Sequence, residues 1–283
     1  DAAGNRTAVT DRNGNRTDFA YDARGNVLTK TDPSPDGVAP RPLTAFAYDL
    51  RNNLTQITDA RGFVTTLSYD PATNALLSVS RQIDGATSAV TKYEYADPAN
   101  AGLPTRVIAP RGNSGPTPDT TYATLLTYDS RGNLETRIDP DGATTSYGYD
   151  LAGRLTSFID PDGFAPGAVP AEHTWAIQYD ANDRETSRTD PLGNTLAYGY
   201  DGAGDRTAVT DRRGNVTTYS YDANTRLATV RQQPDPIAQP ARVYLTQVQR
   251  DANGNATRIT QANGVATDYA FDALDRLVSV TTH

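Results

Sequence analysis

Apolar and polar residues alternate along most of this chain with a period of two. Aromatic or aliphatic residues take every second position in short segments, and small or polar residues stand between them. This pattern predicts β-strands with one buried face, and no segment has the periodicity of a capped helix. The pairs that share a face are Phe19 and Tyr21, Phe46 and Tyr48, Leu67 and Tyr69, Tyr93 and Tyr95, Leu126 and Tyr128, Tyr147 and Tyr149, Ile177 and Tyr179, Tyr198 and Tyr200, Tyr219 and Tyr221, and Tyr269 and Phe271.

Most of these segments end in a Tyr-Asp pair, and the pairs recur in register. From Asp1 to Asp272 the anchoring aspartates are 21 residues apart in six of eleven steps and 27 to 32 apart in the others. We interpret the chain as a 21-residue repeat with insertions. The structural repeat motif comprises Tyr21, Asp22, Gly25, Tyr48, Asp49, Tyr69, Asp70, Tyr128, Asp129, Gly132, Tyr149, Asp150, Gly153, Tyr179, Asp180, Tyr200, Asp201, Gly204, Tyr221, Asp222, Phe271 and Asp272.

Each unit predicts a β-hairpin, because a turn sequence recurs about every ten residues. Aspartate at the first turn position and glycine at the fourth are typical of a type I turn followed by a glycine bulge. The strand after the turn begins with an apolar residue, as at Leu54, Leu134, Leu155, Leu227 and Leu277. We therefore expect tyrosine to end one strand, aspartate to start the turn, and Gly or Asn to complete it.

The insertions occur at the same position in several units. We predict one repeat array over residues 1–283, with Pro- and Gly-rich insertion loops near 33–42, 81–90, 109–121, 161–171 and 234–241. All of them fall at the second turn of the unit and none at the Tyr-Asp turn. Because alternate turns of a meander lie at opposite edges of the sheet, we expect the long loops to share one edge.

These units predict an all-β fold. Two strands per unit give about 22 to 24 antiparallel strands, and open sheets rarely exceed about ten strands without curling. We expect a long hairpin strip that curls into a hollow shell or tube. A propeller would need units that alternate in pairs, and a flattened solenoid would need an apolar interior on both faces. The sequence shows neither feature.

Composition narrows the classes of partner. The net charge of -8 disfavours nucleic acid and anionic membranes, and no apolar run approaches the length of a membrane span. The absence of cysteine excludes disulfides and thiolate sites. With 37% hydrophobic residues the chain does not predict a thick two-sided core. It has neither methionine nor a signal peptide, so we expect a piece of a longer protein.

Candidate chemistry is sparse. The pairs Asp139 with Asp141 and Asp160 with Asp162 offer calcium few oxygens, so we interpret them as solvated turns. His173 stands near Glu172 and Trp175, but one histidine does not build a zinc site. The aromatic stripe is regular enough to be a structural ladder rather than a sugar-binding surface. We expect no catalytic site, no cofactor and no metal, and we expect that the protein is not an enzyme.

The motif Y-D-x-x-G-[NR]-[LV] occurs at Tyr128–Leu134 and Tyr149–Leu155, and D-P-x-G at Asp139–Gly142 and Asp190–Gly193. This pattern, over essentially the whole chain, resembles the Rhs or YD-repeat family. That family includes bacterial polymorphic toxins, the cocoon component of insecticidal toxin complexes, wall-associated proteins and teneurins. The resemblance implies a β-strip that spirals into a hollow shell, which in the toxins encloses a cytotoxic C-terminal domain.

The sequence departs from the toxin pattern in one respect. Those shells end in an aspartyl self-cleavage segment, and none precedes His283, since Asp190–Asn194 is an ordinary repeat turn. Self-cleavage and toxicity are therefore not carried over.

Two functions follow as hypotheses. The first is a structural segment of a secreted Rhs-type shell that encloses or presents an effector. The second is an extracellular adhesin or a self-assembling filament subunit. The implied partners are the rest of the parent shell or other copies of the chain, with an enclosed effector domain or a cell-surface glycan as further candidates. No nucleic acid and no membrane span are expected. The implied location is secreted, extracellular or the bacterial cell surface.

Overall fold

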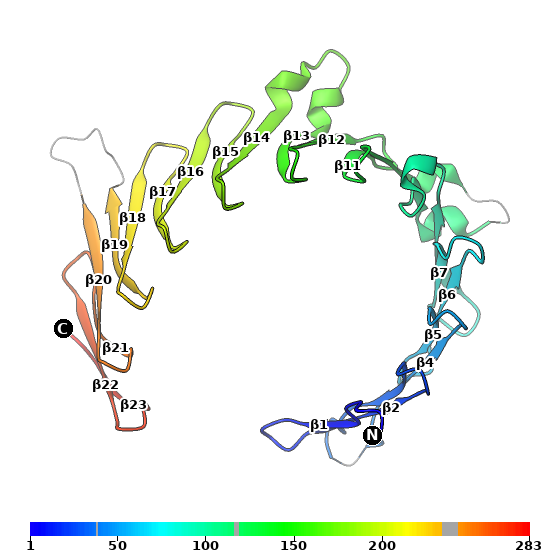
Figure 1. Cartoon of the computed structure of the whole chain (residues 1–283), viewed down its shortest axis with the longest axis horizontal. Coiled ribbons are helices and arrows are strands. Elements are labelled where there is room, and N and C mark those ends of the chain that lie inside the picture. Colours follow the sequence, from blue (N-terminus) through cyan, green and yellow to red (C-terminus); the bar gives the residue numbers. More distant parts are fainter. Residues whose placement is uncertain (38, 116–118, 234–242) are drawn as a thin grey trace. The chain divides into compact units, whose positions relative to one another are not determined.

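The structure, a computed structural model, describes residues 1–37, 39–115, 119–233 and 243–283. These residues form 23 β-strands and five short 3-10 helices. They divide into two compact units, Asp1–Thr144 and Thr145–His283, which run from blue to green and from green to red in Figure 1. Consecutive strands within each unit pair antiparallel. The prediction of an all-β antiparallel hairpin strip is confirmed.

The first unit is a meander in which each strand pairs with the next along the chain. Its elements are β1 (Ala8–Thr10), β2 (Arg16–Tyr21), β3 (Val27–Thr31), β4 (Leu43–Tyr48), β5 (Leu54–Thr58), β6 (Val64–Tyr69), β7 (Leu76–Gln82), β8 (Ser88–Glu94), η1 (Pro98–Asn100), β9 (Arg106–Ile108), η2 (Pro110–Asn113), η3 (Thr120–Tyr122), β10 (Ala123–Tyr128) and β11 (Leu134–Ile138).

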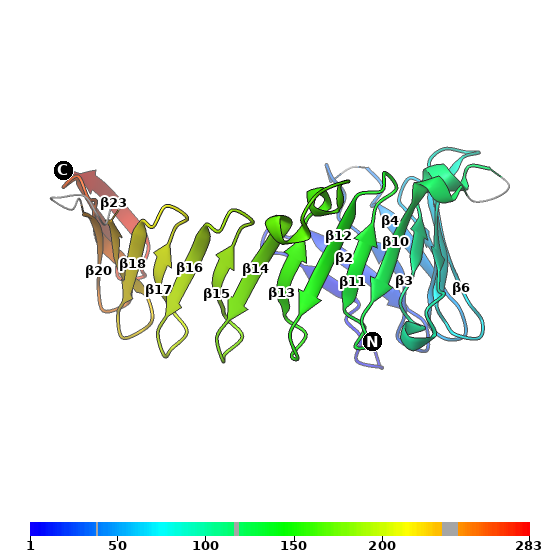
Figure 2. The same cartoon turned by 90° about the horizontal axis from the view of Figure 1, so that it is seen from above.

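The second unit repeats this arrangement. Figure 2 shows its hairpins from β13 to β18 standing side by side, with their turns at two edges. The elements are β12 (Thr144–Tyr149), β13 (Leu155–Ile159), η4 (Pro161–Phe164), η5 (Pro170–His173), β14 (Thr174–Tyr179), β15 (Glu185–Thr189), β16 (Thr195–Tyr200), β17 (Arg206–Thr210), β18 (Val216–Tyr221), β19 (Leu227–Gln233), β20 (Tyr244–Arg250), β21 (Ala256–Thr260), β22 (Ala266–Phe271) and β23 (Leu277–Thr282).

The insertions connect strands at the edge opposite the Tyr-Asp turns within each unit. Residues 33–42, apart from Val38, join β3 to β4; residues 109–121, apart from 116–118, join β9 to β10; and residues 161–171 join β13 to β14. Val38, 116–118 and the whole of the predicted loop 234–241 lie outside the described residues. The loop expected at 81–90 is shorter than that, because β7 and β8 continue pairing as far as Gln82 opposite Ser88.

Two features differ from the sequence prediction. The connections at the edge of the Tyr-Asp turns are not all short. The connection from β8 to β9 contains η1, which Asp97 caps by accepting a hydrogen bond from the Ala99 amide. Two of the insertions also fold into 3-10 turns (η2 and η3, η4 and η5), although no helix was expected. A turn of three or four residues leaves no periodicity for a sequence pattern to reveal.

Very few side chains are buried. Among the described residues the buried hydrophobic set is Ile108, Ala123, Ile177 and Ala266. Apolar contact comes mostly from neighbours across the ladder, such as Phe46 opposite Ile57 and Leu67 opposite Val79. This thin packing accounts for the low hydrophobic content, since cross-strand pairs rather than a second layer cover the apolar face.

Candidate functional site: the Tyr-Asp edge

The Tyr-Asp turns of each unit lie at one edge of its strip, which we call the Tyr-Asp edge. At Asp22 the backbone amide donates to the Asn26 carbonyl, and the Gly25 amide donates to the Asp22 carbonyl. The Asp22 carboxylate accepts from the amides of Arg24 and Asn26, at 2.8 and 2.9 Å. Gly25 has a φ of 85°, which a glycine adopts without steric cost. This is a type I turn followed by a glycine bulge.

The hydrogen bonds of this turn recur with little variation, although the residue at the glycine position changes. The same carboxylate-to-amide bonds are made by Asp49, Asp129, Asp150, Asp180, Asp201, Asp222 and Asp272. Asp70 instead accepts from the amides of Ala72 and Thr73. Non-glycine residues take the left-handed conformation at Asn52, Asn74, Asp183, Thr225 and Asp275. Of these, the β-branched Thr225 is the least suited to that conformation.

The tyrosine hydroxyl binds the neighbouring hairpin. Tyr221, the last residue of β18, donates to the carbonyl of Arg206, the first residue of β17, at 2.8 Å. The backbone ladder between these two strands ends earlier, at Ala208 opposite Thr218. The hydroxyl therefore satisfies a carbonyl that the backbone pairing leaves free.

The same hydroxyl bond recurs along both units. Its other copies join Tyr21 to Arg6, Tyr69 to Leu54, Tyr95 to Leu76, Tyr128 to Pro104, Tyr179 to Leu155 and Tyr200 to Glu185. Where arginine replaces tyrosine, Arg250 donates to the equivalent carbonyl of Leu227 at 3.3 Å. At this position the contact is thus kept although the side chain differs.

The residue after the turn glycine links its turn to the next one. The Asn26 side-chain amide donates to the Asp22 carboxylate of its own turn and to Asn52 Oδ1 of the following turn. Arg184 does the same by ion pairing with Asp180 at 2.7 Å and donating to the Asp201 carbonyl. Equivalent links start from Asn53, Arg154 and Asn255, and Asn100, three residues after Asp97, donates to the Asp129 carbonyl.

Arginine at this position also covers the tyrosine of the next hairpin. The guanidinium carbon of Arg184 lies 4.6 Å from the ring centre of Tyr200, and that of Arg154 lies 5.0 Å from the ring centre of Tyr179. Such cation–π contacts contribute about 0.5–1 kcal/mol at exposed sites. Two hairpins are therefore joined at this edge by a hydroxyl bond, a turn-to-turn bond and, at some copies, a ring contact.

Hydrogen bonds and burial shift the ionisation of the paired residues in opposite directions. The Asn133 side chain holds the pKa of the Asp129 carboxyl below its ordinary value, and the Arg154 side chain does so for Asp150. Burial raises the pKa of the Tyr69, Tyr128 and Tyr221 hydroxyls. The carboxylates are therefore held ionised as acceptors and the hydroxyls are held protonated as donors, which suits a structural contact rather than proton transfer.

The other residues considered from the sequence lie away from this edge. Trp175 of β14 stacks on Phe158 of β13, with ring centres 5.6 Å apart. Asp139 pairs with Arg137, and Asp141 caps its own turn by accepting from the Ala143 amide. Asp160, Asp162 and His173 come together at the insertion between β13 and β14.

Sequence analysis did not predict the hydrogen bonds that join one hairpin to the next at this edge. Tyr95 makes the hydroxyl bond although Ala96 separates it from Asp97, and the linking asparagines and arginines were not singled out. The signal that could have found them is the Asn or Arg position of the motif itself, since both side chains donate hydrogen bonds and can reach a neighbouring turn.

The RHS Repeat family matches residues 1–38, 48–81, 128–165, 179–215, 200–235 and 250–282, which is more than half of the chain. The chain belongs to the RHS repeat family. No curated protein sequence matched it. Among the residues that the structure describes, no helix of this RHS repeat chain has the length and apolar character needed to cross a membrane.

Solved structures share the fold of this RHS repeat chain. They include crystal structures of TcdB2-TccC3-Cdc42 (17% identity, TM-score 0.62), of TcdB2-TccC3 (17%, 0.61), and of TcdB2-TccC3 without its hypervariable C-terminal region (18%, 0.61). Each alignment covers 96% of this chain and 16% of the other chain. The present chain therefore spans a minor part of the length of the proteins it resembles.

Proposed function

We propose that this RHS repeat chain is a structural, non-enzymatic segment of the wall of a secreted Rhs-type shell that encloses or presents an effector. The observation that carries the proposal is the repeated set of contacts at the Tyr-Asp edge, where the same hydroxyl bond joins one hairpin to its neighbour at seven tyrosines. Because the repeated residues join neighbouring hairpins, the sheet can be extended unit by unit.

The packing supports a wall rather than a binding pocket. The strip within each unit is thin, and the motif aspartates are used as turn caps. The family and the fold likewise favour a structural role. The partners that we propose are the rest of the parent shell and an enclosed effector domain, in a protein that is secreted or displayed at the cell surface.

One observation favours the filament alternative. Strand β23 pairs with β22, while its residues Leu277, Val278 and Val280 are 53%, 62% and 54% exposed. An apolar strand of this kind can pair with another copy of the chain and so produce head-to-tail assembly.

Electron microscopy of the purified chain at micromolar concentration tests the proposal. Discrete particles of one size with a curved wall are expected for a shell segment. Long fibres with a regular axial repeat would contradict it and support the filament. A Val278→Lys, Val280→Lys double variant serves as a control, because it would abolish fibres that form through β23 and leave discrete particles unchanged.

A further inference from the structure

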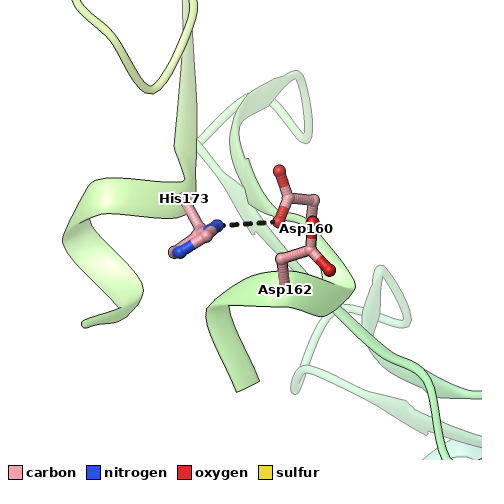
Figure 3. A group of neighbouring side chains, drawn as sticks. All are labelled: Asp160, Asp162 and His173. Carbon is pink, nitrogen blue, oxygen red and sulfur yellow. Dashed lines mark ion pairs between the residues drawn. The ribbon is translucent and has the colours of Figure 1, made fainter. Parts of the chain in front are cut away.

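Asp160, Asp162 and His173 form a cluster in the insertion between β13 and β14. Each offers a ligand atom, and the three atoms lie within 4.8 Å of one another. Asp160 precedes η4, Asp162 lies in η4, and His173 ends η5 (Figure 3). We propose that these three residues bind a first-row divalent transition metal such as Zn²⁺, which would clamp η4 to η5.

Asp160 differs from Asp190, which occupies the equivalent turn of a unit without an insertion. It is the N-cap residue of η4 and yet accepts no hydrogen bond as a cap, whereas Asp190, at the equivalent turn, accepts from the amides of Leu192 and Asn194. Its Oδ1 atom is covered from solvent and accepts no hydrogen bond from the described residues. A covered oxygen without a donor is costly, so this atom is suited to a cation.

His173 supplies the second ligand atom. Its Nδ1 lies 3.3 Å from Asp160 Oδ1, an ion pair when the imidazole is protonated, and no hydrogen bond joins the two atoms (Figure 3). In a neutral imidazole with its proton on Nε2, Nδ1 is itself an acceptor. A metal ion bound by both atoms would satisfy the two acceptors at once.

The loop does not need these side chains in order to fold. In the insertion of the first unit, Ala109 and Tyr122 make the same backbone bond, 3.1 Å from amide to carbonyl, that Asp160 and His173 make at 3.3 Å. In both loops a glycine, Gly112 or Gly163, packs so tightly that a side chain would meet its neighbours at 3.0 Å or less.

The first-unit loop fills the three equivalent positions with other chemistry. Ala109, Arg111 and Tyr122 stand where the second loop has Asp160, Asp162 and His173. Arg111 lies over the Tyr122 ring at 5.2 Å, so that loop is held by a cation–π contact. The second loop lacks this contact, and a bound cation would replace it.

The donor set selects the class of metal. One imidazole and two carboxylates suit zinc and its first-row neighbours, whereas Ca²⁺ prefers six to eight oxygens. Zinc ligands at about 2.0–2.2 Å from the metal lie about 3.4 Å apart in a tetrahedron. Rotation of the exposed Asp162 side chain closes the remaining distance, and water completes the coordination.

Calorimetric titration of the untagged full chain with ZnCl₂ tests the proposal. We expect one equivalent of zinc to bind, and His173→Gln and Asp162→Asn each to weaken binding at least about ten-fold, a loss that even outer-sphere changes cause. Asp162 is exposed, so its variant is expected to fold. The matched control is Asp141→Asn, in a D-P-D-G turn without a histidine, which should leave binding unchanged.

Two further measurements keep the result decisive. Co²⁺ added in place of Zn²⁺ should give a visible absorption band that is lost in the His173→Gln variant, and His283→Gln should preserve it. Equal zinc affinity in the wild type and the His173→Gln variant would overturn the proposal. The absence of zinc binding, or tighter binding of Ca²⁺ than of Zn²⁺, would overturn it as well.

Discussion

At the residue scale, the tyrosine side chain of a Tyr-Asp pair makes two kinds of contact. Its ring covers apolar neighbours on its own sheet face, as Tyr69 does opposite Leu76, and its hydroxyl binds a carbonyl of the preceding strand. Phenylalanine, as at Phe271, supplies only the first of these. Aspartate, which accepts two amide hydrogen bonds from its own turn, fixes the position from which the next strand starts.

Removal of one hydroxyl measures this bond. Tyr221→Phe should lower the free energy of unfolding by about 1 kcal/mol, because the Arg206 carbonyl loses its donor. Tyr219→Phe, on the same strand, is the control, since within the described residues its hydroxyl makes no hydrogen bond. Urea denaturation of both variants checks the difference, and equal effects would show that the hydroxyl bond contributes nothing.

The strained turn at Thr225 offers a gain in stability. Its φ of 57° is a conformation that β-branched residues adopt at a cost, so Thr225→Gly should stabilise the protein by about 1 kcal/mol. Gly214→Ala is the opposite change. Gly214 has a φ of 82° and open space around it, so alanine should lower the stability of the protein by a similar amount through backbone strain alone. Thermal unfolding of both variants tests the pair, and a Thr225→Gly protein that melts earlier contradicts it.

At the element scale, the hairpin is the unit of construction and the Asn or Arg after the turn glycine joins one hairpin to the next. Between the hairpins β14–β15 and β16–β17, the backbone ladder has three pairs, from Ser187 opposite Ala197 to Thr189 opposite Thr195. Arg184 adds a bond to the Asp201 carbonyl and a contact with the Tyr200 ring at one end of that ladder.

Exchange of arginine for asparagine separates these contributions. Arg184→Asn can still bind Asp180, as Asn133 binds Asp129, but it loses the Tyr200 ring. We expect a loss of about 0.5–1 kcal/mol in stability and faster amide exchange in β15 and β16. Arg184→Lys keeps the charge without the planar group and should recover only part of the loss. Full recovery by lysine would mean that charge alone matters.

The turns and strands were predictable because their determinants are local. Asp22, Gly25 and Tyr21 lie within five residues of one another, so the pattern carries the whole turn. The partner of the Tyr69 hydroxyl, Leu54, is 15 residues away, and only the register of paired strands reveals it. The approach of His173 to Asp160 was hidden for the same reason, since the fold of the insertion brings them together.

At the scale of the whole molecule, stability is a sum over similar hairpins, since each contacts mainly its neighbours. The shifted pKa values of several repeated residues should therefore add in the same direction. The pKa of the turn aspartates Asp22, Asp129 and Asp150 is lowered by their hydrogen bonds, and the pKa of Tyr69, Tyr128 and Tyr221 is raised by burial.

This predicts a stability plateau with two limits. A lowered aspartate pKa stabilises the folded state above the ordinary value of 3.8, so stability falls as the pH drops through the folded-state values. A raised tyrosine pKa stabilises the folded state below 10.0 and is lost as the pH rises beyond it. Denaturant midpoints measured across the pH range should be flat between these limits. A maximum confined to a narrow pH range would contradict this.

The account rests on the claim that the tyrosine hydroxyl of a Tyr-Asp turn joins its hairpin to the preceding one. Hydrogen exchange followed by mass spectrometry on the wild type, Tyr221→Phe and Tyr219→Phe proteins tests it most directly. We predict that Tyr221→Phe accelerates exchange in both β17 and β18, on the two sides of the lost bond, and that Tyr219→Phe leaves β17 unchanged. Acceleration confined to β18, or equal in the two variants, would show that the hairpins are held together without the tyrosine hydroxyl.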